Sequence, residues 1–214
     1  MQKEKVLARL EKGGLVAVVR AENTDQAMRI TQACLEGGVA AIEMTFTTPH
    51  AHRVIEELAA KYSPEEILLG AGTVLDPETA RIAILSGAQY VVSPHLNADT
   101  QRLCNRYRVA CMPGVATLRE AVTALEGGAD ILKVFPGELY GPQVIKAFSG
   151  PLPQARMMPT GGVTLDNVGD WLAAGAVAVG VGGSLTAGAK TGDWAKITTT
   201  AKAFMAKIQD YRKG

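Results

Sequence analysis

Ala129-Asp130-Ile131-Leu132-Lys133-Val134-Phe135-Pro136 is a short apolar run that carries one lysine. Gly128 precedes it and Pro136 ends it, which predicts a buried strand of about four to six residues. A lysine rarely enters a core unpaired, because desolvating an ammonium group is costly. Two interpretations stay open: an edge strand whose Lys133 faces solvent or forms a structural ion pair, or a buried lysine. Burial favours the neutral amine, which is a nucleophile able to form a Schiff base with a carbonyl substrate.

Similar apolar runs recur along nearly the whole chain, and amphipathic segments separate them. The eight runs are Leu15–Val19, Ala40–Met44, Ile67–Gly70, Tyr90–Val92, Val109–Met112, Ile131–Val134, Ala155–Met158 and Val177–Val181. Strands that alternate with helices predict βαβ units and a parallel sheet. Eight units with little spare sequence predict one α/β domain over residues 1–214, a (β/α)₈ TIM barrel. An open doubly wound sheet is the alternative, although no GxGxxG follows the first run.

Further amphipathic segments extend this scheme at both ends of the chain. Gln2–Lys12 predicts an extra N-terminal helix that closes the bottom of the barrel, and Asp193–Lys213 predicts a terminal helix. The intervening helices are expected at Asp25–Glu36, Ala51–Lys61, Pro77–Ser86, Asp99–Arg106, Leu118–Glu126, Gln143–Phe148 and Leu165–Ala173.

Composition narrows the class of partner. Lys and Arg number 22 against 21 Asp and Glu, so charge argues against nucleic acid as a partner and gives no polybasic membrane signal. No apolar run reaches the roughly 18 residues of a membrane span, and residues 1–12 lack the apolar core of a signal peptide, so a cytoplasmic protein is expected. Cys34, Cys104 and Cys111 form no close pair and are interpreted as small buried hydrophobes. No cluster has metal-ligand spacing, so neither a metal nor another cofactor is expected.

Polar residues and glycines follow the apolar runs, where the catalytic face of such a barrel lies. They are Arg20, Glu43 to Thr45, Thr73, Pro94, Gly114, Thr160 to Gly162 and Gly182 to Ser184, with Lys133 inside the sixth run. Glu43 is either an ion-pair partner of Lys133 or Arg20, or a general acid and base in a partly dry pocket.

The glycines after the last two runs suggest a phosphate site. Thr160-Gly161-Gly162 and Gly182-Gly183-Ser184 stand where such barrels often cradle a phosphate with backbone N–H groups. Glycine lets the backbone approach the phosphate oxygens closely. Ordinary turn glycines are the alternative interpretation of each loop.

With these residues in view, the chain resembles the class I 2-keto-3-deoxy-6-phosphogluconate (KDPG) aldolases, also described as 2-keto-4-hydroxyglutarate (KHG) aldolases. The resemblance runs from about Leu15 to Ser184, and its phrases are 41-AIEMT-45, 69-LGAGTVL-75, 90-YVVSP-94, 112-MPG-114, 132-LKVFP-136, 159-PTGG-162 and 181-VGGS-184. It implies a (β/α)₈ barrel that assembles as a homotrimer and acts on a small phosphorylated keto acid.

The resemblance also implies roles for individual residues. Lys133 is similar to the Schiff-base lysine of the family, and Glu43 to its acid–base residue. Thr73, Pro94 and Thr160 resemble substrate contacts. The implied phosphate cradle consists of Gly161, Gly162, Gly183 and Ser184.

One position departs from the family pattern. Some members carry an arginine four residues after the glutamate to bind the substrate carboxylate, and here Thr47 stands there. Arg20, Thr47, Thr48 or backbone amides near Thr73 must then hold that group, and Arg20 is favoured because an arginine can bind a carboxylate with two hydrogen bonds. The alternative for Arg20 is a surface ion pair with Glu22 or Glu43.

The implied reaction is cleavage of KDPG to pyruvate and glyceraldehyde 3-phosphate, and also of 4-hydroxy-2-oxoglutarate to pyruvate and glyoxylate. The galactonate epimer is an open alternative: Thr160 fits the gluconate enzymes, while Tyr140-Gly-Pro-Gln-Val-Ile-Lys146 resembles the galactonate relatives. Two further hypotheses are a phosphosugar epimerase or isomerase that uses Lys133 as an electrostatic clamp, and a phosphosugar sensor without turnover.

Overall fold

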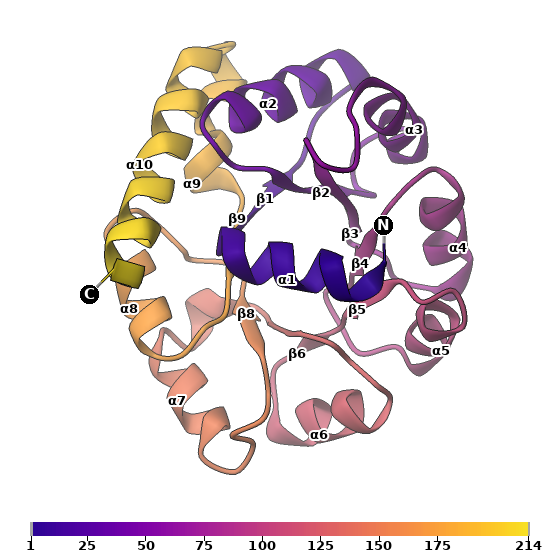
Figure 1. Ribbon diagram of the computed structural model, residues 1–214, viewed down its shortest axis with the longest axis vertical. Helices are drawn as coiled ribbons and strands as arrows, with labels where there is room; N and C mark the ends of the chain where they lie inside the picture. Colours follow the sequence, from indigo (N-terminus) through magenta and orange to yellow (C-terminus); the bar gives the residue numbers. More distant parts are fainter. Residues whose placement is uncertain (1, 214) are drawn as a thin grey trace.

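Parallel strands occupy the centre of the molecule, and helices surround them (Figure 1). The computed structural model describes residues 2–213. Within this range the strands are β1 (Leu15–Val19), β2 (Ala41–Thr45), β3 (Leu68–Gly72), β4 (Tyr90–Val92), β5 (Ala110–Met112), β6 (Gly114–Val115), β7 (Leu132–Val134), β8 (Met157–Pro159) and β9 (Val179–Val181). The predicted α/β fold with parallel strands is confirmed.

Helices follow the strands in the predicted alternation. They are α1 (Lys3–Gly13), α2 (Thr24–Glu36), α3 (Ala51–Lys61), α4 (Pro77–Leu85), α5 (Ala98–Arg106), α6 (Leu118–Glu126), α7 (Gln143–Ser149), α8 (Val168–Ala173), α9 (Gly183–Thr186) and α10 (Trp194–Lys213), with 3₁₀ turns η1 (Gly137–Leu139) and η2 (Ala187–Thr191). The local sequence explains several starts: Asn23, Asp76 and Asn97 each accept a hydrogen bond from a first-turn N–H of the helix that follows.

The strands form two parallel sheets. The larger has the order β5-β4-β3-β2-β1-β9, and the smaller has the order β6-β7-β8. The chain passes directly from one to the other between β5 and β6, and an isolated bridge between Thr160 and Gly180 links the end of β8 to β9. The larger sheet curls, so that its strands surround a packed interior.

The predicted fifth strand ends before Pro113, and a further short strand, β6, follows this proline. β5 pairs with β4, whereas β6 pairs with β7, so the strand changes partner at this residue. Proline has no backbone N–H to donate to a ladder, which explains why the pairing breaks here. The Pro113 carbonyl still accepts a hydrogen bond of 2.9 Å from the Lys133 N–H, so the break lies directly beside the lysine.

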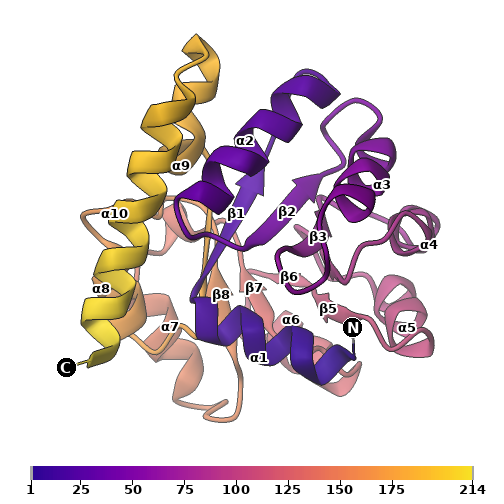
Figure 2. The same ribbon diagram turned by 45° about the horizontal axis from the view of Figure 1, so that its top comes forward.

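Helix α1 crosses one end of the strands, as the sequence predicted for residues 2–12 (Figures 1 and 2). Its buried Val6, Leu7 and Leu10 pack with Val16, Leu68 and other side chains of the sheet interior. The opposite ends of the strands are therefore the ones open to solvent. Cys34, Cys104 and Cys111 are buried free thiols, as expected. Within residues 2–213, no helix has both the length and the apolar character needed to cross a membrane.

Candidate active site

Lys133 and Glu43 lie together in the interior of the strands. Lys133 stands in the middle of β7, between β6 and β8, and Glu43 stands in the middle of β2. Their side chains are 5% and 0% exposed, and Lys133 Nζ is 3.7 Å from Glu43 Oε1. The interpretation of an edge strand with a solvent-facing lysine is therefore wrong.

The Lys133–Glu43 separation is longer than a tight charge-assisted hydrogen bond, which measures about 2.7–2.9 Å. Neither carboxylate oxygen of Glu43 has a hydrogen-bond partner among residues 2–213. The Phe135 ring packs on the other side of the amine, with its centroid 5.1 Å from Nζ. The geometry thus brings an amine and a carboxylate within reach of one small reactant in a nearly dry place.

A glycine makes room for the carboxylate. A Cβ on Gly72, at the end of β3, would lie 2.0 Å from Glu43 Oε1 and 2.5 Å from its Cγ. Real Cβ atoms never approach so closely, so the carboxylate occupies the space that any other side chain at this position would take. Glycine is therefore required at position 72, because any side chain there would clash with the Glu43 carboxylate.

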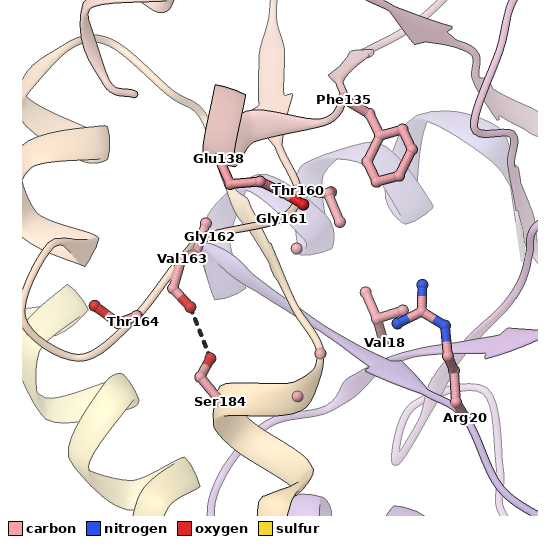
Figure 3. Close-up of a pocket in the computed structure, with 13 residues that line it drawn as sticks. Val18, Arg20, Phe135, Glu138, Thr160, Gly161, Gly162, Val163, Thr164 and Ser184 are labelled. Carbon is pink, nitrogen blue, oxygen red and sulfur yellow. Dashed lines mark hydrogen bonds between the residues drawn. The ribbon is translucent and has the colours of Figure 1, made fainter. Parts of the chain in front are cut away.

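A cavity of about 390 Å³ lies at the ends of β1, β8 and β9, and Phe135 forms part of its wall (Figure 3). Its lining includes the predicted residues Arg20, Thr160, Gly161, Gly162, Gly183 and Ser184, together with Phe135, Glu138, Val163 and Thr164. The Arg20 guanidinium reaches in from one side, and the two glycine loops lie on the other side (Figure 3). Phe135 lines the cavity and its ring also packs against the Lys133 amine, so one side chain borders both the cavity and the lysine.

The loop after β8 has a backbone that only glycine adopts readily. Gly161 and Gly162 have φ values of 93° and 71°, in the left-handed region. Their backbone N–H groups donate no hydrogen bond to another of the described residues. The Ser184 hydroxyl donates a 2.7 Å hydrogen bond to the Val163 carbonyl and so ties this loop to α9 (Figure 3). Free N–H groups beside an arginine suit an anionic group.

A second cavity of about 500 Å³ adjoins the first and shares Val18, Arg20 and Gly183 with it. Thr47 lines this second cavity, and its hydroxyl lies 2.9 Å from that of Thr45. Arg20 is exposed, and within residues 2–213 it forms no ion pair with Glu22 or Glu43. Arg20 thus projects, unpaired, between both cavities.

The comparisons with known proteins agree with this geometry. The family model "KDPG and KHG aldolase" matches residues 6–200. The chain belongs to the KDPG and KHG aldolase family.

Curated members of the family match over most of both chains. A 2-dehydro-3-deoxy-6-phosphogalactonate aldolase of Escherichia coli K12 is 34% identical, over 93% of this chain and 95% of its own length. A 2-dehydro-3-deoxy-phosphogluconate aldolase of Pseudomonas aeruginosa is also 34% identical, over 93% of this chain and 91% of its own. A KHG/KDPG aldolase of E. coli K12 is 33% identical, over 90% and 91%.

Solved structures of the family superpose closely. A native KDPGal structure gives a TM-score of 0.87 at 32% identity, covering 94% of this chain and 96% of that one. A KDPG aldolase from Legionella pneumophila, with pyruvate captured as a covalent carbinolamine, gives 0.86 at 27% identity, covering 95% and 98%.

Two predicted substrate contacts in this family member lie outside the cavity lining. Thr73 follows β3 with a φ of 54°, a left-handed conformation that is rare for a β-branched residue. Pro94 follows β4, and Gly114 lies so close that a Cβ there would be 2.2 Å from the Pro94 carbonyl carbon. Both residues are half-buried, and their contact with substrate stays a prediction. No group of three or more His, Cys, Asp or Glu side chains in residues 2–213 has an arrangement that would hold a metal ion.

Phe135 and Glu138 also line the site and were not predicted from the sequence. Phe135 lies two positions after Lys133, and residues two apart along a strand share a face, so this signal was present. Glu138 in η1 also lines the cavity and packs against the glycine loop, where a Cβ on Gly161 would be 1.9 Å from its Oε2. Nothing in the local sequence around Glu138 indicates that contact.

Proposed function

We propose that this protein is a Schiff-base aldolase that cleaves KDPG to pyruvate and glyceraldehyde 3-phosphate. The observation that carries this proposal is the buried Lys133 amine, 3.7 Å from the buried Glu43 carboxylate, beside a cavity with an arginine and free backbone N–H groups. The gluconate, galactonate and hydroxyglutarate aldolases among its relatives support the same reaction class.

The proposed mechanism begins with attack of the neutral Lys133 amine on the keto carbon, which gives a carbinolamine. Loss of water then leaves a protonated imine, which is an electron sink for the pair released when the C3–C4 bond breaks. In this mechanism Glu43 protonates the departing hydroxyl as water, removes the proton of the C4 hydroxyl and returns a proton to C3 of the enamine. Hydrolysis of the imine frees pyruvate and the lysine, and no metal or cofactor takes part.

The substrate phosphate is proposed to bind between Arg20 and the loops that contain Gly161, Gly162, Gly183 and Ser184. Arg20 lines the same cavity as those loops, which supports a contact with the phosphate rather than with the carboxylate that the sequence favoured. The carboxylate would then be held near Thr73 and Thr47, on the β3 and β2 loops. We expect Arg20→Ala to raise KM for phosphorylated substrate much more than KM for 4-hydroxy-2-oxoglutarate.

The galactonate epimer is the second candidate substrate, and the 34% identity to a phosphogalactonate aldolase favours keeping it. We expect the Thr160 hydroxyl to discriminate between the epimers, because it is buried in the cavity wall without a hydrogen-bond partner in the described chain. Pyruvate release measured with both epimers in parallel decides between them.

The two sheets are proposed to close into one eight-stranded (β/α)₈ barrel, and the protein is proposed to form a homotrimer in the cytoplasm. Exposed apolar side chains on two helices that flank α5 support an interface between copies: Ile82 and Leu85 on α4, and Leu118 and Val122 on α6. Light scattering coupled to size exclusion tests the trimer, and a monomer would contradict it.

Trapping with borohydride tests the proposed chemistry. Pyruvate plus borohydride should add a reduced pyruvyl group irreversibly at Lys133, detected by peptide mass, and Lys133→Met should prevent it. A folded protein that is not labelled rules out the Schiff base. A Lys133→Met variant that still exchanges protons on a sugar phosphate would favour the epimerase alternative, and ligand binding with no turnover would favour the sensor.

A further inference from the structure

Tyr90 is buried beside the proposed acid–base residue. Its side chain is 0% exposed, and its hydroxyl has no hydrogen-bond partner among residues 2–213. Glu43 is also 0% exposed, and neither of its oxygens has a hydrogen-bond partner in the same part of the chain. A neutral phenol can donate a hydrogen bond and an ionised carboxylate can only accept, so the two groups are complementary.

The sheet register aims this hydroxyl at Glu43. Glu43 pairs with Gly70, and Gly70 pairs with Tyr90, so the three residues stand at one level of β2, β3 and β4 and face the same side. Gly70 has no side chain, and a Cβ there would lie 2.2 Å from Tyr90 Cε2 and 2.3 Å from Cζ. The Tyr90 ring therefore fills the space over Gly70, and this carries its hydroxyl from β4 toward β2.

The electrostatics agree with that placement. Burial, and secondarily the negative charge of Glu43, raise the pKa of the Tyr90 hydroxyl well above its usual value. Tyr90 is therefore a neutral donor throughout the working pH range. The other neighbours of Glu43 in its own register layer are Val18 and Gly70, which carry no charge, and Lys133 approaches from β7.

We propose that Tyr90 is a positioning residue that holds Glu43 for proton transfer, its hydroxyl donating a hydrogen bond to the carboxylate through one bound water. This inference rests on the proposed aldolase function. When Lys133 gives up its proton to attack the keto carbon, its charge no longer stabilises the Glu43 carboxylate. The Tyr90 donor stays in place at that moment, so the Glu43 carboxylate stays oriented to take a proton from C3 of the imine and to return it to C3 of the enamine.

Tyr90→Phe tests this role, because it removes only the hydroxyl and keeps the ring over Gly70. The readout is exchange of the pyruvate methyl protons with deuterium oxide, which isolates proton transfer at C3. We expect exchange to slow about tenfold, as befits one lost hydrogen bond to a charged group, and the acid limb of its pH profile to move to higher pH. Borohydride trapping of the imine at saturating pyruvate should reach the same extent as in the wild-type protein.

Tyr211→Phe is the matched control, because it removes a tyrosine hydroxyl that bonds to the Leu172 carbonyl on the outside of the molecule. That variant should keep the wild-type exchange rate and pH profile. A stably folded Tyr90→Phe protein with both properties unchanged overturns the inference, because a hydroxyl that only packs would leave the pH profile where it is.

The two proposals fail in different ways. If the wild-type protein neither exchanges pyruvate protons nor traps pyruvate, the aldolase function itself is wrong. If the wild-type protein does both and Tyr90→Phe matches it, only the role of Tyr90 is wrong. Thermal unfolding of each variant shows that the comparison is made between folded proteins.

Discussion

Gly72 and Gly70 show how the reactive side chains obtain their space. A Cβ on Gly72 would meet the Glu43 carboxylate, and a Cβ on Gly70 would meet the Tyr90 ring. Neither glycine has a positive φ, so each is needed for its missing side chain and not for its backbone conformation. The two glycines of β3 thus leave room for the longer side chains of the adjacent strands, Glu43 on β2 and Tyr90 on β4.

Gly72→Ala should therefore displace the Glu43 carboxylate without straining the backbone. Because the added Cβ would lie 2.0 Å from Oε1, the carboxylate must move by about 1 Å or more, and such a misplacement costs about 10²-fold in rate. Steady-state pyruvate release measures this loss. Gly169→Ala in α8 is the control, since a Cβ there meets nothing within 4 Å and should leave the rate unchanged. A Gly72→Ala variant of wild-type activity would contradict the steric argument.

The helices and strands were largely predictable from the sequence, because each has its own hydrophobic periodicity and many helices have a recognisable N-cap residue. Leu118–Glu126 is an example: Thr117 and Glu120 form a capping box, and the observed α6 has the predicted bounds. The short strand β6 after Pro113 was missed, because its formation depends on which strand lies alongside it. The left-handed backbone of Thr73 was equally invisible, since a threonine gives no local signal for it.

The capping box of α6 makes stability depend on pH. Hydrogen bonds from the Ala116 N–H and from Thr117 lower the pKa of the Glu120 carboxyl below its usual value. A lowered folded-state pKa contributes stability above the unfolded-state value of about 4.3 and loses it as the pH falls through the folded value.

Glu120→Ala should therefore cost about 0.5–2 kcal/mol near neutral pH, and the difference from wild type should shrink near pH 3. Urea unfolding at the two pH values measures both effects. Glu126→Ala, at the exposed other end of α6, should change the free energy of unfolding little at either pH. A cost for Glu120→Ala that stays constant down to pH 3 would mean that its charge does not matter.

At the scale of the whole molecule, Lys133 and Glu43 meet because parallel strands bring distant parts of the chain to one level. The sequence alone supplied both residues, and the resemblance supplied their roles. Their separation, and the layer of Glu43, Gly70 and Tyr90, depend on strand register, which the sequence pattern does not specify. Helix α1 covers one end of the strands (Figure 2). The residues that line the cavities follow the other ends of β1, β8 and β9.

This separation predicts that damage to the α1 end lowers stability and spares the chemistry. Leu10 is 1% exposed and packs into the strand interior, so Leu10→Ala should reduce the free energy of unfolding by about 2–5 kcal/mol. At a temperature where the variant remains folded, its kcat for pyruvate release should equal that of the wild-type protein, because Leu10 lines neither cavity. Lys5→Ala, on the exposed face of the same helix, should change neither quantity. If kcat falls together with stability in Leu10→Ala, the packing of helix α1 affects the positions of Lys133 and Glu43, and the prediction is wrong.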